Sequence, residues 1–535
     1  MLLAGAVAAP LLSVGLNVLV SGTAGTWAHL ADTVLADYLL TTVWLCLGVG
    51  VGVVGWGVGA AWLVTRYEFA WRRHLEWALV LPLAMPAYVA AYIYTDFLQY
   101  VGPVQTTLRA VMAWGRRDYW FPDIRSTAGA ALMFSLVLYP YVYLLTRTAL
   151  LERGGGLVEV ARSMGLAPWQ GFVRVSLPLA RPAIVAGVAL ALMETLADYG
   201  TVSYFGVQTF TTGIYRAWFA LGDRAAAAQL ACALLGFVVA VLALERWSRG
   251  QARFHDTTLR RTGTPRQGLG RLRGALATAA CALPLLLGFL LPAGLLLRMA
   301  LLEGDAQFGA RFLGLARNSV LVAGSTAALA VALALLLGYA ARVHRGPAMQ
   351  WSHRVAGLGY ALPGSVIAVG VLIPVTRVDQ LLAASLRQTL NLEVGLLFTG
   401  TIVALVYACL VRYLATAMQA VDAGLAKITP HMDQAARSLG HTPLQTLARV
   451  HLPLLRGSLL TAALLVFLDV MKELPATLVM RPFNFDTLAT QAYTLASDER
   501  LAEASTSALA IVAVGLLPMW LLCRQIARGH SVSAS

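Results

Sequence analysis

The stretch that decides the fold is E-V-A-R-S-M-G-L-A-P-W-Q-G-F-V-R-V-S-L-P-L-A-R, residues 159–181. A second version, Q-A-A-R-S-L-G-H-T-P-L-Q-T-L-A-R-V-H-L-P-L-L-R, occupies residues 434–456, at a constant offset of 275. Twelve of the 23 positions are identical without a gap. An ungapped match of this length indicates a tandem duplication.

Each copy predicts a helix, a sharp turn and a short second helix. The turn is assigned to Gly165 and Gly440, because glycine readily adopts the left-handed conformation that ends a helix. Thr442 can cap the short helix of the second copy. Each copy contains two prolines. The first suits the start of the short helix, and the second is expected to break the short helix before the next apolar run. These are Pro168 and Pro178 in the first copy, and Pro443 and Pro453 in the second.

The composition indicates a membrane protein. Hydrophobic residues make up 59% of the 535 residues, charged residues only 12%, and the mean hydropathy is +0.70. About 20 apolar residues are needed to cross a bilayer. Twelve candidate spans are 2–21, 40–64, 77–98, 128–146, 183–204, 225–244, 275–297, 318–341, 355–375, 395–414, 457–477 and 505–523. The first is expected to be a retained span and not a signal peptide, because no Lys or Arg precedes it.

The repeat and the spans together predict an all-α, polytopic fold of two tandem six-helix halves. The first half covers residues 1–245, a basic linker covers 246–273, and the second half covers 274–535. Lys and Arg number 26 on one side of the predicted membrane and 13 on the other. The positive-inside rule then places both termini, the linker and both loop copies in the cytoplasm. The linker is interpreted as a connector beside anionic lipid headgroups, without a role in nucleic-acid binding.

The loop spacing resembles that of one family, the permeases of binding-protein-dependent ABC importers. Their cytoplasmic loop has the form E-A-A, three residues, G, nine residues, I, one residue, L-P. The residues that match this pattern without a gap are Glu159, Ala161, Gly165, Val175, Leu177 and Pro178, and then Gln434, Ala435, Ala436, Gly440, Val450, Leu452 and Pro453, with valine for isoleucine in both copies. Pro168 and Pro443 lie within the nine-residue stretch and join them as candidate residues of the ATPase-coupling loops. The departures include Val160 for the middle alanine and Gln434 for the acid, with Asp433 displaced one residue earlier.

The resemblance implies a type I ABC importer permease in a bacterial inner membrane. In this family the loops dock on a separate ATPase, so two copies of a cytoplasmic ATPase subunit and an extracytoplasmic solute-binding protein are the expected partners. The chain has no G-x-x-x-x-G-K-[ST] phosphate loop. It is therefore expected not to be an enzyme itself and to hold no cofactor, with ATP and Mg²⁺ bound by the partner subunit.

Acidic residues inside the membrane are the candidates for a translocation path, because charge at mid-bilayer is costly. Glu194 and Asp198 follow the first loop, and under the 275 offset they fall on Asp469 and Glu473. The i, i+4 spacing predicts that each pair shares a helix face. They form a carboxylate route for a cation, or else structural pairs with Lys472 and with arginines of other spans. Tyr199 joins them as a candidate path residue.

Two segments resemble the ferric-iron uptake permeases: M-E-T-L-A-D-Y-G-T-V at 193–202 with its continuation to 218, and D-V-M-K-E-L-P-A-T-L-V-M-R-P at 469–482 with its continuation to 490. Ferric iron is therefore the expected substrate, and hard oxygen ligands suit it. No metal site is assigned to particular residues. Permeases for thiamine, polyamines or oxyanions share the architecture and stay open, as does a proton-coupled secondary transporter.

A second repeated feature is a proline early in a span. Pro86 in W-A-L-V-L-P-L-A-M-P and Pro363 in G-L-G-Y-A-L-P-G fall in equivalent places. Proline removes a helical hydrogen bond, so a kink or opening is predicted at both positions.

Overall fold

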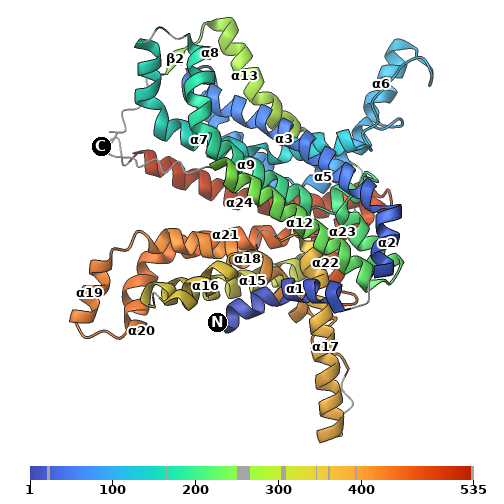
Figure 1. Cartoon of the computed structure of the whole chain (residues 1–535). Helices are drawn as coiled ribbons and strands as arrows, with labels where there is room; N and C mark the ends of the chain where they lie inside the picture. The colour runs from blue at the N-terminus through green and yellow to red at the C-terminus, as the bar shows by residue number, and fades with distance from the viewer. Residues whose placement is uncertain are drawn as a thin grey trace. The chain divides into compact units, whose positions relative to one another are not determined.

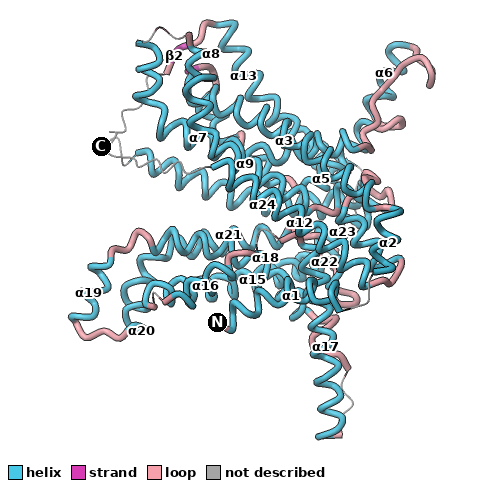
Figure 2. Tube along the Cα trace, in the orientation of Figure 1, coloured by secondary structure: helices cyan, strands magenta, loops and turns pink. Residues whose placement is uncertain are grey.

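The computed structural model describes residues 1–20, 24–163, 165, 167–249, 266–302, 309–344, 346–359, 362–391 and 395–531. Most of these residues are helical (Figure 2). Within them, strand pairing is limited to β1 (Tyr67–Glu68) and β2 (Gln267–Gly268), which are parallel. The all-α fold predicted from the sequence is confirmed.

The chain forms two compact units, coloured along the sequence in Figure 1. Unit 1 comprises 1–33, 213–235 and 306–494, and unit 2 comprises 34–212, 236–305 and 495–535. The helices of unit 1 are α1 (Leu2–Val20), α2 (Ala24–Thr33), α15 (Ala310–Val343), α16 (Pro347–Ala356), α17 (Gly364–Leu390), α18 (Ile402–Leu425), α19 (Pro430–Ser438), α20 (Pro443–Thr446), α21 (Leu452–Met471), α22 (Pro475–Met480) and most of α23 (Leu488–Ser497).

The helices of unit 2 are α3 (Leu35–Arg66), α4 (Arg72–Ala78), α5 (Ala87–Leu98), α6 (Pro103–Met112), α7 (Thr127–Ser163), α8 (Pro168–Gly171), α9 (Leu177–Ala197), α10 (Gly200–Tyr204), α13 (Arg271–Leu285), α14 (Leu291–Leu302) and α24 (Leu501–Ser531). Helices α11 (Phe210–Tyr215) and α12 (Arg224–Arg249) are divided between the two units.

Each unit combines the core of one sequence repeat with the first helix of the other. In unit 1, α1 packs on α16 and α17, and the Tyr407 hydroxyl donates to the Ala6 carbonyl at 2.5 Å. In unit 2, α14 packs on α5 and α24, and the Tyr94 hydroxyl donates to the Leu287 carbonyl at 2.5 Å. Burial of apolar surface therefore joins elements that are distant in sequence, and the compact units are not the two sequence halves.

The predicted spans coincide with apolar helices. Among the described residues, nine helices are long and apolar enough to cross a membrane. A tenth candidate is the pair Arg72–Ala84 and Ala87–Met112, bent by 92°. The first and last predicted spans fall on α1 and α24, whose described apolar stretches are shorter: Leu3–Asn17 and Leu501–Leu517.

The two prolines interrupt their spans as predicted. Pro86 has extended backbone angles and immediately precedes α5, and Pro363 does the same before α17. The expected bounds 355–375 and 395–414 are wrong, because α17 begins only after Pro363 and α18 runs from Ile402 to Leu425. Within α17, the buried Asp379 carboxylate accepts the backbone N–H groups of residues 397–399, so the loop before α18 is held against α17.

Candidate functional site

The second loop copy has the predicted turn. Gly440 has a φ of +80°, in the left-handed region that favours glycine. The His441 N–H donates to the Ala436 carbonyl at 3.0 Å, and the Gly440 N–H donates to the Arg437 carbonyl at 2.9 Å. This pair of bonds is the Schellman motif that closes α19 and satisfies its last carbonyls.

The short helix α20 begins at Pro443 with a complete capping box. The Thr442 hydroxyl accepts from the Gln445 N–H at 3.3 Å, and the Gln445 side chain accepts from the Thr442 N–H at 3.0 Å. In the first copy Gln170 accepts from the Ala167 N–H at 3.3 Å, but alanine has no hydroxyl to return the bond. Among the described residues, the complete capping box, with both backbone N–H groups bonded, is therefore seen in the second copy.

The first loop copy turns in the same way. Gly165 has a φ of +76°, and α8 starts at Pro168. The side chains of Glu159, Ala161 and Pro168 lie outside the described part of the structure. The turn and the short helix therefore match the second copy, as the repeat predicts.

Pro178 and Pro453 do not break the chain after the short helix, so this expectation is wrong. A five-residue π-helical turn, Phe172–Ser176 or Leu447–His451, joins each short helix to the following span without interruption. The last N–H before each proline donates to the carbonyl five residues earlier. The wider turn avoids the clash between a proline ring and the carbonyl at i−4 that would kink an ordinary α-helix.

The predicted carboxylate pairs do not each share a helix face, so this expectation is also wrong. Helix α9 ends at Ala197 and α21 ends at Met471, which leaves Asp198 and Glu473 beyond the helix ends. The cause is local, because each of these carboxylates accepts a backbone N–H from the first turn of the short helix that follows it.

In unit 2, the Asp198 carboxylate accepts from the Thr201 N–H at 2.8 Å, at the start of α10. Its backbone carbonyl accepts from the Thr211 hydroxyl at 2.9 Å. Glu194 and Tyr199 are half-buried close to it in the chain. These three predicted path residues therefore lie around one helix break.

In unit 1, Glu473 is 4% exposed and satisfied on both carboxylate oxygens. One oxygen accepts from the Arg412 guanidinium and from the Tyr413 hydroxyl, both at 2.5 Å. The other accepts from the Ala476 N–H at 2.9 Å. Such an arrangement compensates the cost of burying both charges, so Glu473 is a structural brace between α18 and α22.

Asp469 also has a charged partner. Its carboxylate lies 3.0 Å from the Lys472 ammonium, and both side chains are half-buried. Asp469 and Glu473 therefore form ion pairs of the kind that the structural alternative requires.

The role of Arg412 was not predicted from the sequence, because this arginine was one of the 26 basic residues assigned to the cytoplasmic side. The structure places it inside α18, where it is 7% exposed. The signal was available, because Arg412 follows the apolar run Val403–Val411 and a buried arginine requires an acidic partner. The expected span 395–414 ended only two residues after Arg412, whereas α18 continues to Leu425, so Arg412 lies near the middle of the helix and not at its end.

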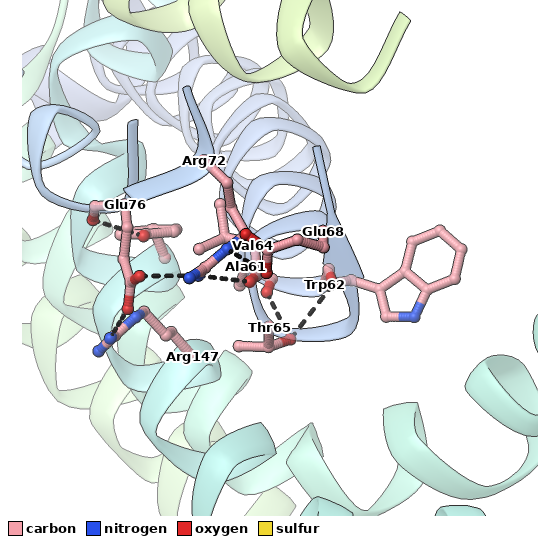
Figure 3. Close-up of polar contacts among 9 residues, drawn as sticks. Ala61, Trp62, Val64, Thr65, Glu68, Arg72, Glu76 and Arg147 are labelled. Carbon is pink, nitrogen blue, oxygen red and sulfur yellow. Dashed lines mark hydrogen bonds and ion pairs between the residues drawn. The ribbon is translucent and has the colours of Figure 1, made fainter. Parts of the chain in front are cut away.

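A buried charge cluster in unit 2 was also missed (Figure 3). Arg72 is 4% exposed; its guanidinium lies 3.0 Å from the Glu68 carboxylate and 2.9 Å from that of Glu76. Glu76 also pairs with Arg147 of α7, and its backbone carbonyl accepts from the Tyr143 hydroxyl at 2.7 Å. The cluster fastens α4 to the end of α3 and to α7.

A family comparison decides the assignment. The family model of the "binding-protein-dependent transport system inner membrane component" matches residues 53–250 and again 330–528. Each match contains one copy of the loop described above. The chain belongs to this family. It is therefore a multi-pass inner-membrane permease of an ABC importer, and the family works with an ATPase and a solute-binding protein.

The relatives of this permease differ in how much of it they cover. The Fe(3+)-transport system permease protein FbpB 2 of Haemophilus influenzae is 27% identical over 497 residues, covering 91% of this chain and 90% of its own. The sulfate transport system permease protein CysT of Escherichia coli is 31% identical over 28% of this chain and 50% of its own. The molybdenum transport system permease protein ModB of Escherichia coli is 26% identical over 36% and 83%.

Proposed function

We propose that this permease imports ferric iron. The observation that carries the proposal is end-to-end similarity to an Fe(3+)-transport permease, over 91% of this chain. The sulfate and molybdenum relatives match about a third of the chain or less. Because the iron permease matches both halves of this chain in one alignment, the similarity favours the substrate of a fused, two-repeat permease.

The two loops are proposed to couple transport to ATP hydrolysis on a separate subunit. Two loops of one shape, with left-handed turns at Gly165 and Gly440, suit two copies of one ATPase. Each loop continues through a π-helical turn into a membrane span, so a force on the loop reaches the span through unbroken helix. ATP and Mg²⁺ belong to the partner, and this chain carries no catalytic step.

The translocation path is proposed to include Glu194, Asp198 and Tyr199. Glu194 and Tyr199 are half-buried, and the Asp198 carboxylate sits at a helix break and not in a buried ion pair. Glu473 is less suited to bind a moving cation, because Arg412 and Tyr413 already occupy its oxygens.

The second candidate substrate is an oxyanion, because sulfate and molybdenum permeases are among the relatives. The deciding experiment reconstitutes the permease with its ATPase and binding protein in vesicles and measures ATP-dependent uptake of labelled ferric iron, sulfate and molybdate. Uptake of iron alone is expected. Uptake of an oxyanion without iron would reject the iron assignment and retain the importer, and a hydrolysis-deficient ATPase is the control for leakage.

A further inference from the structure

A polar network supports the second coupling loop in unit 1. Its centre is Asp433, the acid that the loop carries one residue before the expected position. One carboxylate oxygen lies 2.8 Å from the Arg342 Nε, and the other lies 2.6 Å from the His451 Nε2. The three side chains come from α19, from the end of α15 and from the π-helical turn before α21. Asp433 therefore holds the loop at both of its ends.

Arg342 extends the network to a fourth element. Its Nη1 donates to the Leu425 carbonyl at 2.9 Å and its Nη2 donates to the Ile428 carbonyl at 2.7 Å. These carbonyls lie at and just beyond the end of α18, where unsatisfied acceptors favour a cation. The guanidinium thus uses three of its nitrogens to join α15, α18 and α19.

Tyr339 holds the other side of the same loop. Its hydroxyl donates to the Pro443 carbonyl at 2.6 Å, and its ring meets the His451 ring edge-on at 5.1 Å. Tyr339 and Arg342 are three residues apart on α15, so they project from one face of that helix. His451 has no exposed surface. One helix face therefore contacts α19, α20 and the π-helical turn together.

The sequence of the first coupling loop lacks the residues of this network. Under the offset of 275, Asp433 falls on Val158 and His451 on Ser176, which cannot form the same ion pairs. Aromatic rings support that loop instead: the Trp62 ring of α3 lies 4.6 Å from Phe172 and 6.0 Å from Trp169. The two loops share a shape but differ in the chemistry that holds them.

Ionisation of Asp433 is favoured in the folded loop. Burial opposes it, but the hydrogen bonds from Arg342 and His451 outweigh burial and hold the pKa of the Asp433 carboxyl below its usual range. The carboxylate is thus present at neutral pH to bind both partners.

We propose that Arg342, Asp433 and His451, with Tyr339, form a latch that positions the second coupling loop on α15 and transmits loop movement to that helix. The inference rests on the proposed coupling function and deepens it, since these are positioning residues for the ATPase contact. An unlatched loop still docks, but it moves without carrying α15. Hydrolysis then continues while transport per ATP falls.

The test measures uptake and ATP hydrolysis in the same vesicles, with the complete transporter. Asp433→Asn and His451→Gln are expected to lower the ratio of substrate imported to ATP hydrolysed by about tenfold, as for residues within one hydrogen-bond network. The double variant is expected to be no worse than either single variant, and Asp433→Glu is expected to restore part of the ratio. His344→Gln, which removes an exposed imidazole two residues after Arg342, is the matched control.

Different experimental results would reject the latch and the coupling function. If the wild-type permease neither binds an ATPase nor stimulates it, the coupling function is wrong. If the wild type couples normally and the latch variants keep its ratio, the latch alone is wrong. Should Asp433→Asn fail to assemble, Tyr339→Phe decides, because it removes one hydroxyl and keeps the ring against His451; an unchanged ratio there overturns the proposal.

Discussion

Glu76 pairs with Arg147 in unit 2, and in unit 1 a histidine and an aspartate pair at the equivalent positions, with the acid on the other helix. When the two repeats are aligned so that Pro86 matches Pro363, Glu76 matches His353. With the offset of 275 that aligns the two loops, Arg147 matches Asp422. The His353 Nε2 lies 3.2 Å from the Asp422 carboxylate. The contact of α4 with α7 thus has its counterpart between α16 and α18. One of the two pairs contains a histidine, so only that pair is sensitive to pH near neutrality.

The first prediction concerns this pH sensitivity. The hydrogen bond that His353 donates to the Asp422 carboxylate raises the pKa of His353 above its ordinary value of 6.5, against the opposing effect of burial. A raised pKa in the folded state stabilises the protein at pH values below the unfolded pKa, and this stabilisation is lost as pH rises through the folded pKa. We expect the melting temperature to fall as pH rises above about 6.5. His353→Gln should remove that part of the slope, and an unchanged slope would contradict the pairing.

The second prediction concerns the cluster in Figure 3. Glu76→Gln leaves the guanidinium groups of Arg72 and Arg147 without their shared acid, and Glu76 is only 12% exposed. Removing one partner of a buried pair costs about 3–5 kcal/mol. We expect a large fall in melting temperature in detergent. Glu68→Gln is the control, because Glu68 is 50% exposed and its loss should cost about 1 kcal/mol or less.

The helical class, the membrane spans and the repeat could be predicted from the sequence, because duplication and hydropathy are properties of residue order, but the exchange of helices between the two compact units could not. The turns at Gly165 and Gly440 and the breaks at Pro86 and Pro363 were predictable for the same reason, since backbone chemistry is local.

The rest depends on tertiary partners. The position of Arg412 inside α18 becomes favourable only because Glu473 meets it there. The helix ends before Asp198 and Glu473 depend on capping of the short helices that follow. Likewise, Pro178 and Pro453 are tolerated within helices because a π-helical turn precedes each. None of these arrangements follows from residue spacing alone.

The third prediction separates structural acids from path acids in unit 1. Glu473→Gln strands the buried Arg412 charge, so we expect a loss of about 3–5 kcal/mol in stability and a lower yield of folded permease. Asp469→Asn only removes a half-buried pair with Lys472, so its effect should be about 1 kcal/mol or less. Thermal unfolding of both variants checks this. A stable Glu473→Gln variant would show that Glu473 is not a brace.

The fourth prediction concerns Glu194 and Asp198. If they line the path, Glu194→Gln combined with Asp198→Asn should reduce uptake by about tenfold or more while melting temperature changes little, because amides keep shape but lose charge. The measurement is ATP-dependent uptake beside thermal stability on the same preparation. Normal uptake with normal stability would exclude a role in transport. A loss of stability would instead identify these acids as structural.

The last prediction concerns the left-handed turn at Gly440. A Cβ added at this position meets no atom within 4 Å, so any effect of a substitution comes from the backbone and not from a clash with neighbours. Gly440→Ala should strain the turn by about 1–2 kcal/mol, and Gly440→Asn by less, because asparagine adopts this conformation more readily. Gly440→Pro cannot reach a φ of +80° and should displace α20 altogether. We expect ATPase co-purification to decline in the order Gly, Asn, Ala, Pro while membrane insertion stays normal. Full ATPase binding by Gly440→Pro would mean that this loop is not the docking element.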